Sequence, residues 1–380
     1  MSFFKIFALE FRAIFSNSTI LLIVFGGSLM YVLLYPTPYK SDLIRDQKIA
    51  VVDLDQSMQS KELIFYVNSM PQNQVTQILD SEHQALESLT HNKIFGYLII
   101  PKGFEKNLKK GVPAHLAYIA NASYFSAYGA IVEGLNDAAN ALGQQIIIQT
   151  KILQNSTIHQ KADLLQKTSI PLFNPSNGYL NYALAAILIF ILHQTAIGGT
   201  MLLGAFQNKE NNPTSYYRTQ SFFKILFARL LIFGGIYILL FLLFFGFFFT
   251  LYDINIKANI VDFWCFALVF IFAMLSLGIF LGLFIKNTAL PTQIVLISSL
   301  PIVFLLGFIW PSELIPDFLK SISALIPAYH GINGFLKLNQ MSASLNQIMP
   351  QFFYLLFLGC FYSFCAIFYH SFYIRNKNLQ

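Results

Sequence analysis

The run FARLLIFGGIYILLFLLFFGFFFTL at residues 227–251 decides the fold class, because it consists mostly of Leu, Ile and Phe. A helix needs about 20 apolar residues to cross the roughly 30 Å hydrocarbon core of a bilayer. Each Leu, Ile or Phe favours insertion by roughly 0.3–0.6 kcal/mol, and their sum outweighs one arginine. We expect Arg229, near one end of the run, to extend its guanidinium toward the membrane surface. The run therefore predicts a membrane-spanning helix.

The rest of the chain has the same character. Its 380 residues are 56% hydrophobic and only 11% charged, and the mean hydropathy is +0.57. These values lie outside the range of soluble domains. Apolar stretches of spanning length occur near 18–36, 179–206, 227–251, 263–285, 288–310 and 352–374. We therefore expect an α-helical polytopic membrane protein with six spans, which places both termini on the same side.

The short connections predict the orientation, because Lys and Arg accumulate on the cytoplasmic side. One side holds Lys5, Arg12, Lys209, Arg218, Lys224, Arg229, Lys286, Arg375 and Lys377. The other holds only Lys257, Lys320 and Lys337. Both termini are thus expected in the cytoplasm. The net charge of +6 reflects this bias, so we expect no nucleic-acid partner.

Residues 1–15 predict a helix that lies in the membrane interface. Lys5 and Arg12 share one face, and the apolar residues repeat at helical spacing at Phe4, Phe7, Phe11, Ile14 and Phe15. The alternative is a frayed start of the first span. The apolar run that follows is long enough to span and lacks a small-x-small cleavage site, so the segment 1–36 is expected to stay attached.

Residues 37–175 form a polar insert that predicts an extracytoplasmic α/β domain. Strands are expected at 48–54, 74–79, 95–101 and 114–120, and helices at 60–70 and 81–92. A long helix with a packing seam begins near Phe125, with apolar residues at Tyr128, Val132, Leu135, Ala139, Leu142, Ile146 and Leu153.

Two acidic groups in this insert have alternative interpretations. The segment DLDQS (53–57) is either a cation site or a turn in which Ser57 or Asp55 caps the next helix. Glu133 and Asp137 form either an acidic pair or part of a solvated face. Elsewhere the sequence contains no G-x-x-x-x-G-K-[ST], G-x-S-x-G or H-E-x-x-H motif. We therefore expect no catalytic, cofactor-binding or metal-binding residues in this chain.

Polar residues occur near the middle of two predicted spans. His193, Gln194 and Thr195 lie in the second span, and Thr292, Gln293, Ser298 and Ser299 lie in the fifth. Polar groups at this depth face the protein interior or a water-filled path. They either line a substrate path or subunit seam, or they make ordinary interhelical hydrogen bonds worth about 0.6 kcal/mol each.

Two connecting segments have marked features. The segment NNPTSYYRTQSFFK (211–224), within the cytoplasmic loop 207–224, predicts a short helix capped by Asn212. The re-entrant segment 311–330 contains Pro311, Pro316 and Pro327, which predict short helices that dip shallowly into the outer leaflet. Its acidic residues, Glu313 and Asp317, either attract a cationic substrate or cap helices.

Three segments carry a family resemblance: KIAVVDLDQSMQSKEL (48–63), GYLIIPKGFEKNLKKG (96–111) and GFIWPSELIPDFLKSISALIPAYHGINGF (307–335). With the six-span layout, they resemble the type-2 ABC exporter permeases that have a large extracytoplasmic domain between the first two spans. The resemblance covers nearly the whole chain. The sequence departs from the family pattern at two places. Only Glu210 remains of an acidic run after the second span, and Asn121 replaces an expected aspartate.

The resemblance implies a permease of the bacterial inner membrane, built as a homodimer or heterodimer and driven by separate ABC ATPase subunits that bind ATP and Mg. It implies efflux of hydrophobic, drug-like or lipidic compounds, with a membrane-fusion adaptor as a further partner in a tripartite pump. The ATPases would contact the surface helix and the loop through Phe7, Arg12, Glu210, Thr214, Tyr216, Tyr217 and Arg218. The alternative function is an ATPase-independent scaffold or receptor for a secretion machine.

Overall fold

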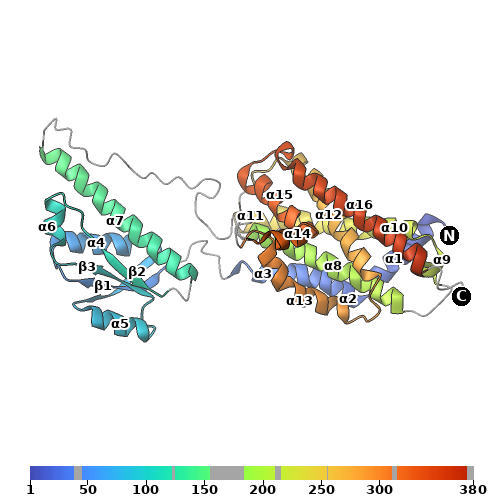
Figure 1. Ribbon diagram of the computed structural model, residues 1–380, viewed down its shortest axis with the longest axis horizontal. Coiled ribbons are helices and arrows are strands. Elements are labelled where there is room, and N and C mark those ends of the chain that lie inside the picture. Colours follow the sequence, from blue (N-terminus) through green and yellow to red (C-terminus); the bar gives the residue numbers. More distant parts are fainter. Residues whose placement is uncertain are drawn as a thin grey trace. The chain divides into compact units, whose positions relative to one another are not determined.

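The computed structural model describes residues 1–37, 45–121, 125–154, 184–209, 215–254, 256–309 and 315–374. The chain separates into two compact units (Figure 1). The helical unit consists of Met1–Lys40 and Pro171–Gln380, and the inserted unit consists of Ser41–Ile170.

The helical unit begins with a bent pair of helices. Helix α1 (Phe3–Phe15) meets the helix at Ser18–Leu34 at 73°. The second helix consists of α2 (Ser18–Leu21), the π-helical turn η1 (Leu22–Gly27) and α3 (Ser28–Leu34). Asn17 starts it by accepting hydrogen bonds from the backbone N–H groups of Thr19 and Ile20. Such an angle suits an interfacial helix followed by a span.

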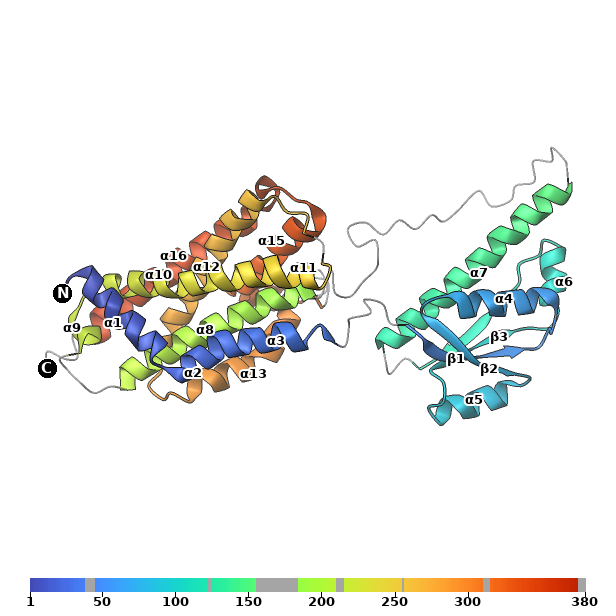
Figure 2. The ribbon, with the colours of Figure 1, turned by 180° about the vertical axis from the view of Figure 1, so that it is seen from behind.

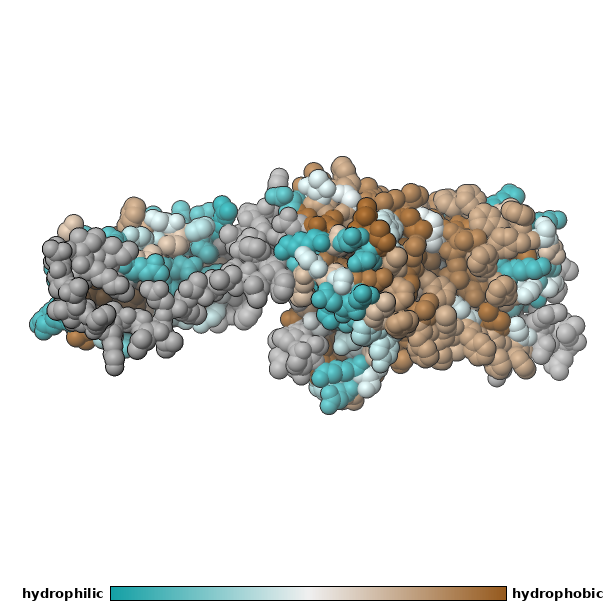
Figure 3. Space-filling view, turned by 90° about the horizontal axis from the view of Figure 1, so that it is seen from above, coloured by the Kyte–Doolittle hydropathy of each residue, from teal (hydrophilic) through white to brown (hydrophobic). Residues whose placement is uncertain are grey.

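Long apolar helices form the rest of this unit. They are α8 (Ala185–Lys209), α10 (Phe222–Phe241), α12 (Ile260–Gly282), α13 (Leu290–Leu305) and α16 (Met349–Tyr369). A π-helical stretch, η4 (Leu242–Phe248), continues α10 into α11 (Phe249–Leu251). The surface of the unit is mostly apolar, with polar residues toward its ends (Figure 3).

The six-span prediction is confirmed only in part. Within the described ranges, four helices are long and apolar enough to cross a membrane, and the bent pair raises this to five. Helix α13 is apolar but has only 16 residues, which gives a length of roughly 24 Å.

Helix α8 lies at the centre of the unit and packs closely on α12. Its Gly204 lies against the backbone of Gly282 in α12, and a Cβ at Gly204 would stand 2.7 Å from the Gly282 carbonyl oxygen. Gly278 likewise faces the backbone of Ile197, which its own Cβ would approach to 2.9 Å. Small residues let helix backbones approach this closely. The contact therefore depends on glycines in both helices.

The expectation that the re-entrant segment forms only short helices is wrong for its second half. Helix α14 (Asp317–Ser323) is short, but α15 (Pro327–Met341) has 15 residues and is largely buried against α8, α12 and α16. Its Phe335 is fully buried in a cluster of aromatic rings, with centroids 4.9–5.7 Å away, contributed by Phe241, Phe245, Phe263, Phe266 and Phe270. The residues Pro311 and Glu313 lie outside the described residues.

The inserted unit is built on a four-stranded sheet with strand order β2-β1-β3-β4. Strand β1 (Gln47–Asp53) runs parallel to β2 (Asn73–Leu79) and β3 (Gly96–Ile100), and β4 (Ala117–Ala120) is antiparallel to β3. Helices α4 (Met58–Ser69), α6 (Phe104–Lys109) and α7 (Phe125–Gln154) cover one face of the sheet. Helix α5 (Glu82–Thr90) covers the other face (Figure 2). The predicted strands and helices all occur.

The long helix α7 begins at Phe125, as predicted, and has 30 residues, but its seam differs from the prediction. Among the helix positions whose burial is described, the buried apolar side chains are Ile131, Leu135, Ala138 and Leu142, so the buried face departs from the predicted one at several positions. These residues pack against α4 and the sheet instead of forming a separate seam.

The DLDQS segment is a turn with capping residues. Ser57 caps α4 by accepting from the Ser60 N–H at 3.1 Å, as predicted. Asp55 instead accepts from the N–H groups of Gly103 at 2.7 Å and Glu105 at 3.0 Å, at the start of α6. Asp53 accepts from the Asp55 N–H and the Ser60 hydroxyl. Among the described residues, no three metal-ligating side chains come together.

Replacement of Asp55 by Asn is expected to loosen α6. Burial opposes ionisation of Asp55, but hydrogen bonds from the Glu105 backbone, Ser57 and the Gly103 backbone outweigh it and lower its pKa below 3.8. The stabilisation is therefore present above the unfolded pKa and disappears as the pH falls through the folded value. We expect a loss of about 1 kcal/mol, seen as faster hydrogen exchange at Gly103 and Glu105. Asp137→Asn, on an exposed part of α7, is the control, and equal exchange rates in both variants contradict the expectation.

Candidate functional site

A buried polar network joins four helices at one end of the helical unit. It connects α1, the end of α8, the short helix α9 (Tyr216–Thr219) and α10. The N-terminal amine also lies at this end, where it donates to the Gln220 side chain at 2.8 Å.

The centre of the network is an ion pair between Glu10 and Arg229. The Arg229 Nε donates to Glu10 Oε2 at 3.0 Å, and the side chains of Arg229 and Glu10 are 1% and 0% exposed. The expectation that Arg229 reaches toward the membrane surface is therefore wrong. Its charge is neutralised inside the protein, because an unpaired buried charge costs several kcal/mol.

Gln207 and Tyr216 complete the coordination of this ion pair. The Gln207 Nε2 donates to Glu10 Oε1 at 3.1 Å and to the Tyr216 hydroxyl at 2.9 Å. The Tyr216 hydroxyl donates to Glu10 Oε1 at 3.0 Å, and Arg229 donates to Gln207 Oε1. One carboxylate thus holds the surface helix α1, α8, α9 and α10 together.

Tyr217 fastens α9 on its other side. Its hydroxyl donates to Asn208 Oδ1 at 3.1 Å, and its backbone oxygen lies 2.9 Å from the His370 Nε2 in η7 (His370–Ile374). Burial raises the pKa of Tyr217 to about 12, so its hydroxyl stays protonated as a donor. Asn208 donates in turn to backbone carbonyls at the end of α12, those of Gly282, Leu283 and Ile285.

A second polar group lies within the bundle. Gln194 Nε2 donates to Ser299 Oγ at 2.9 Å, which joins α8 to α13. Thr195 Oγ1 lies 3.1 Å from the Ser28 hydroxyl in α3 and accepts from the Tyr237 hydroxyl at 3.1 Å. His193 is fully buried beside Phe270, and neither of its ring nitrogens has a hydrogen-bond partner among the described residues.

The comparison with known protein families supplies the identification. A family model described as ABC-2 family transporter protein matches residues 12–368. The chain belongs to this family. Its members are the membrane components of ABC transporters, so the chain is a permease subunit that works with ABC ATPase subunits. No curated protein and no solved structure matches it.

The residues predicted to contact the ATPase occupy different positions in this permease. Phe7 is half-buried on α1, and Arg12 is exposed on the same helix. Tyr216 and Arg218 are half-buried, whereas Tyr217 is only 1% exposed. In this conformation the Tyr217 side chain holds the loop helix in place and presents no surface to a partner. Glu210 and Thr214 lie outside the described residues.

The predicted polar residues of the fifth span are divided between two environments. Ser299 contacts Gln194 of the permease itself, which is intrachain packing. Ser298 bonds to its own helix at the Val295 carbonyl, and Thr292 and Gln293 are exposed. A role for these residues in a substrate path or subunit seam stays a prediction.

Sequence reasoning missed Glu10, Gln207, Asn208 and His370. A signal was present for Glu10, because it lies four residues from both Ile6 and Ile14. Those three positions share one helix face, and all three are buried. A lone acidic residue between two apolar ones on a buried face needs a partner charge. The identity of that partner, 219 residues away, was not deducible from spacing.

The Gln194–Ser299 pair provides a test of the two interpretations of the mid-span polar residues. Gln194→Leu and Ser299→Ala are each expected to lower stability by about 0.6 kcal/mol, because each removes the same interhelical hydrogen bond. The double variant should lose no more stability than either single variant. A double-mutant cycle followed by thermal unfolding measures this. Ser298→Ala is the matched control. Additive losses would show that the two side chains do not interact.

Proposed function

We propose that this permease is the membrane half of an ATP-driven exporter of the bacterial inner membrane. Separate ATPase subunits, with their ATP and Mg, act on α1 and α9 from the cytoplasmic side. The observation that carries the proposal is the Glu10–Arg229 network, because it joins these two surface elements to the ends of α8 and α10. A displacement of α1 or α9 then moves whole helices instead of a flexible loop.

The second chain of the transporter is proposed to lie against α13. Among the described apolar helices of this unit, α13 is unusually exposed, with Leu296, Ile297 and Leu300 each 67–75% exposed. Thr292 and Gln293 lie on the same short helix and are also exposed. A second copy or a paralogue of this permease would cover this face, and relative rotation of the two chains would open an export path.

The cargo is proposed to be hydrophobic, drug-like or lipidic, and the inserted unit is proposed to contact a membrane-fusion adaptor. The apolar interior of the helical unit and its many phenylalanines support the first part. The adaptor contact is supported by the inserted unit, because its exposed Met58 and Phe65 on α4 offer apolar contact area to a partner.

Charge reversal at the surface of α1 and α9 tests the ATPase contact. We expect Arg12→Glu and Arg218→Glu to reduce co-purification of the ATPase subunit. Lys93→Glu, which reverses an exposed charge in the inserted unit, should leave co-purification intact. Unchanged complex formation in both variants would contradict the proposed contact. Transport by the purified permease without any ATPase would instead favour an ATPase-independent role.

A further inference from the structure

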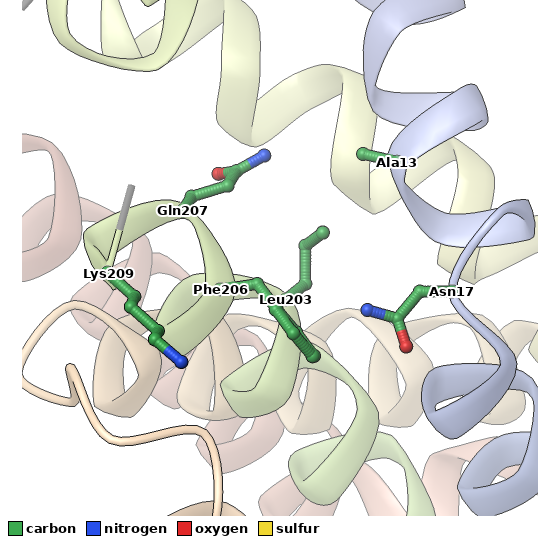
Figure 4. Close-up of a pocket in the computed structure, with 6 residues that line it drawn as sticks. All are labelled: Ala13, Asn17, Leu203, Phe206, Gln207 and Lys209. Carbon is green, nitrogen blue, oxygen red and sulfur yellow. The ribbon is translucent and has the colours of Figure 1, made fainter. Parts of the chain in front are cut away.

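A cavity of about 470 Å³ opens at the bend between α1 and the following helix. We call it the elbow pocket. The end of α8 forms its opposite wall (Figure 4). It is lined by Ala13, Asn17, Leu203, Phe206, Gln207 and Lys209.

The lining is amphiphilic. Ala13, Leu203 and Phe206 form an apolar wall, and Phe206 is 37% exposed. Asn17, Gln207 and Lys209 supply the polar groups. A ligand that fills the elbow pocket therefore needs both a polar and an apolar part.

The polar groups that remain available are donors. The Asn17 Oδ1 already accepts two backbone hydrogen bonds, which leaves its Nδ2 group. Gln207 uses both ends of its amide within the Glu10–Arg229 network. Lys209 forms no ion pair with any carboxylate in the described part of the chain. These three side chains thus offer one amide donor and one ammonium group, and no free acceptor. A ligand that binds them is therefore expected to be an anion.

The position of the elbow pocket indicates the source of the anion. Helix α1 exposes Phe4, Phe11 and Phe15, and it bends by 73° from the helix that follows. Such a junction of an interfacial helix with a spanning helix lies at the level of the lipid headgroups. The cytoplasmic leaflet is rich in anionic lipids there, and each nearby Lys contributes about 1 kcal/mol to their binding.

We propose that the elbow pocket binds the headgroup phosphate of an anionic phospholipid. Lys209 and the Asn17 amide hold the phosphate, and Leu203 and Phe206 contact the glycerol and the start of an acyl chain. Because Gln207 belongs both to the pocket wall and to the Glu10–Arg229 network, the lipid borders the network directly. The lipid is then a structural component of the permease at the bend of its first helix pair.

Lipid binding to the full-length permease tests this proposal. Native mass spectrometry of the purified permease with phosphatidylglycerol or phosphatidylcholine should show one retained phosphatidylglycerol and no retained phosphatidylcholine. Lys209→Gln should weaken retention roughly fivefold, the equivalent of one lysine near a lipid surface. Lys209→Arg keeps the cation and should retain the lipid. Lys224→Gln, an exposed lysine in the first turn of α10 outside the pocket, is the control.

Several results would overturn the proposal. Equal losses in Lys209→Gln and Lys224→Gln would show only general attraction to a basic surface. Displacement of the lipid by millimolar inorganic phosphate would indicate a site for free anions. Release of the lipid when the ATPase binds would assign the pocket to the ATPase. Lys209 is exposed and makes no ion pair within the described ranges, so its variants should fold, and thermal unfolding checks this.

Discussion

Replacement of Glu10 by Gln is expected to destabilise the permease by about 3–5 kcal/mol, the usual loss when one partner of a buried ion pair is removed. The change leaves the Arg229 guanidinium charged and almost inaccessible to water, with a neutral amide where its counter-ion stood. The loss should appear as a lower melting temperature in detergent. Arg12→Gln removes an exposed charge from the same helix and should have little effect.

The double variant Glu10→Gln with Arg229→Met separates stability from coupling. It removes both charges, so most of the lost stability should return. If the network transmits movement from α1 to α10, this stable variant should nevertheless transport less cargo for each ATP hydrolysed by the partner subunits. A double variant that remains as unstable as Glu10→Gln, or one with normal coupling, would contradict our account of the network.

Replacement of Gly204 by Ala is expected to disrupt the central helix pair. The new Cβ would meet the oxygen, carbon and Cα of Gly282 at 2.7, 2.8 and 2.9 Å, and none of these backbone atoms can move aside as a side chain can. Overpacking of this kind costs about 1–3 kcal/mol or more, and here it separates α8 from α12. We expect low yields of folded permease and a lower melting temperature.

Gly235→Ala provides the matched control for this change. A Cβ at Gly235 on α10 meets nothing within 4 Å, and alanine favours a helix over glycine by about 1 kcal/mol. This variant should be as stable as the natural permease or slightly more stable. Equal yields and melting temperatures for Gly204→Ala and Gly235→Ala would show that the α8–α12 contact is looser than described.

Local patterns in the sequence predicted local structure well. Apolar runs located the long helices, and short apolar stretches in the polar insert located β1, β2, β3 and β4. The start of α7 followed from its periodicity, although the buried face was displaced because the sheet and α4, not a partner helix, cover it. Patterns of this kind report which residues are apolar, but not which surface covers them.

Features that depend on distant residues were not predictable. The burial of α15 is one such feature, because even its polar residues His330, Asn339 and Gln340 are buried. The composition of α15 contains no information about α8 and α12, which cover it. For the same reason Arg229 was expected to reach the surface, since its counter-ion, Glu10, lies 219 residues earlier in the chain. The burial of Tyr217 and its hydrogen bonds to Asn208 and His370 were not predictable either, since both partners lie outside its own helix.

The π-helical turn η1 at Leu22–Gly27 has a consequence for insertions and deletions in related chains. A π turn holds one residue more than an α turn, so this segment contains a surplus residue. Deletion of that residue would restore regular geometry, and everything before it would rotate by about 100° around the helix axis. Glu10 would then point away from Arg229. The direction in which α1 faces is thus set by a single extra residue, and its deletion would break the Glu10–Arg229 ion pair.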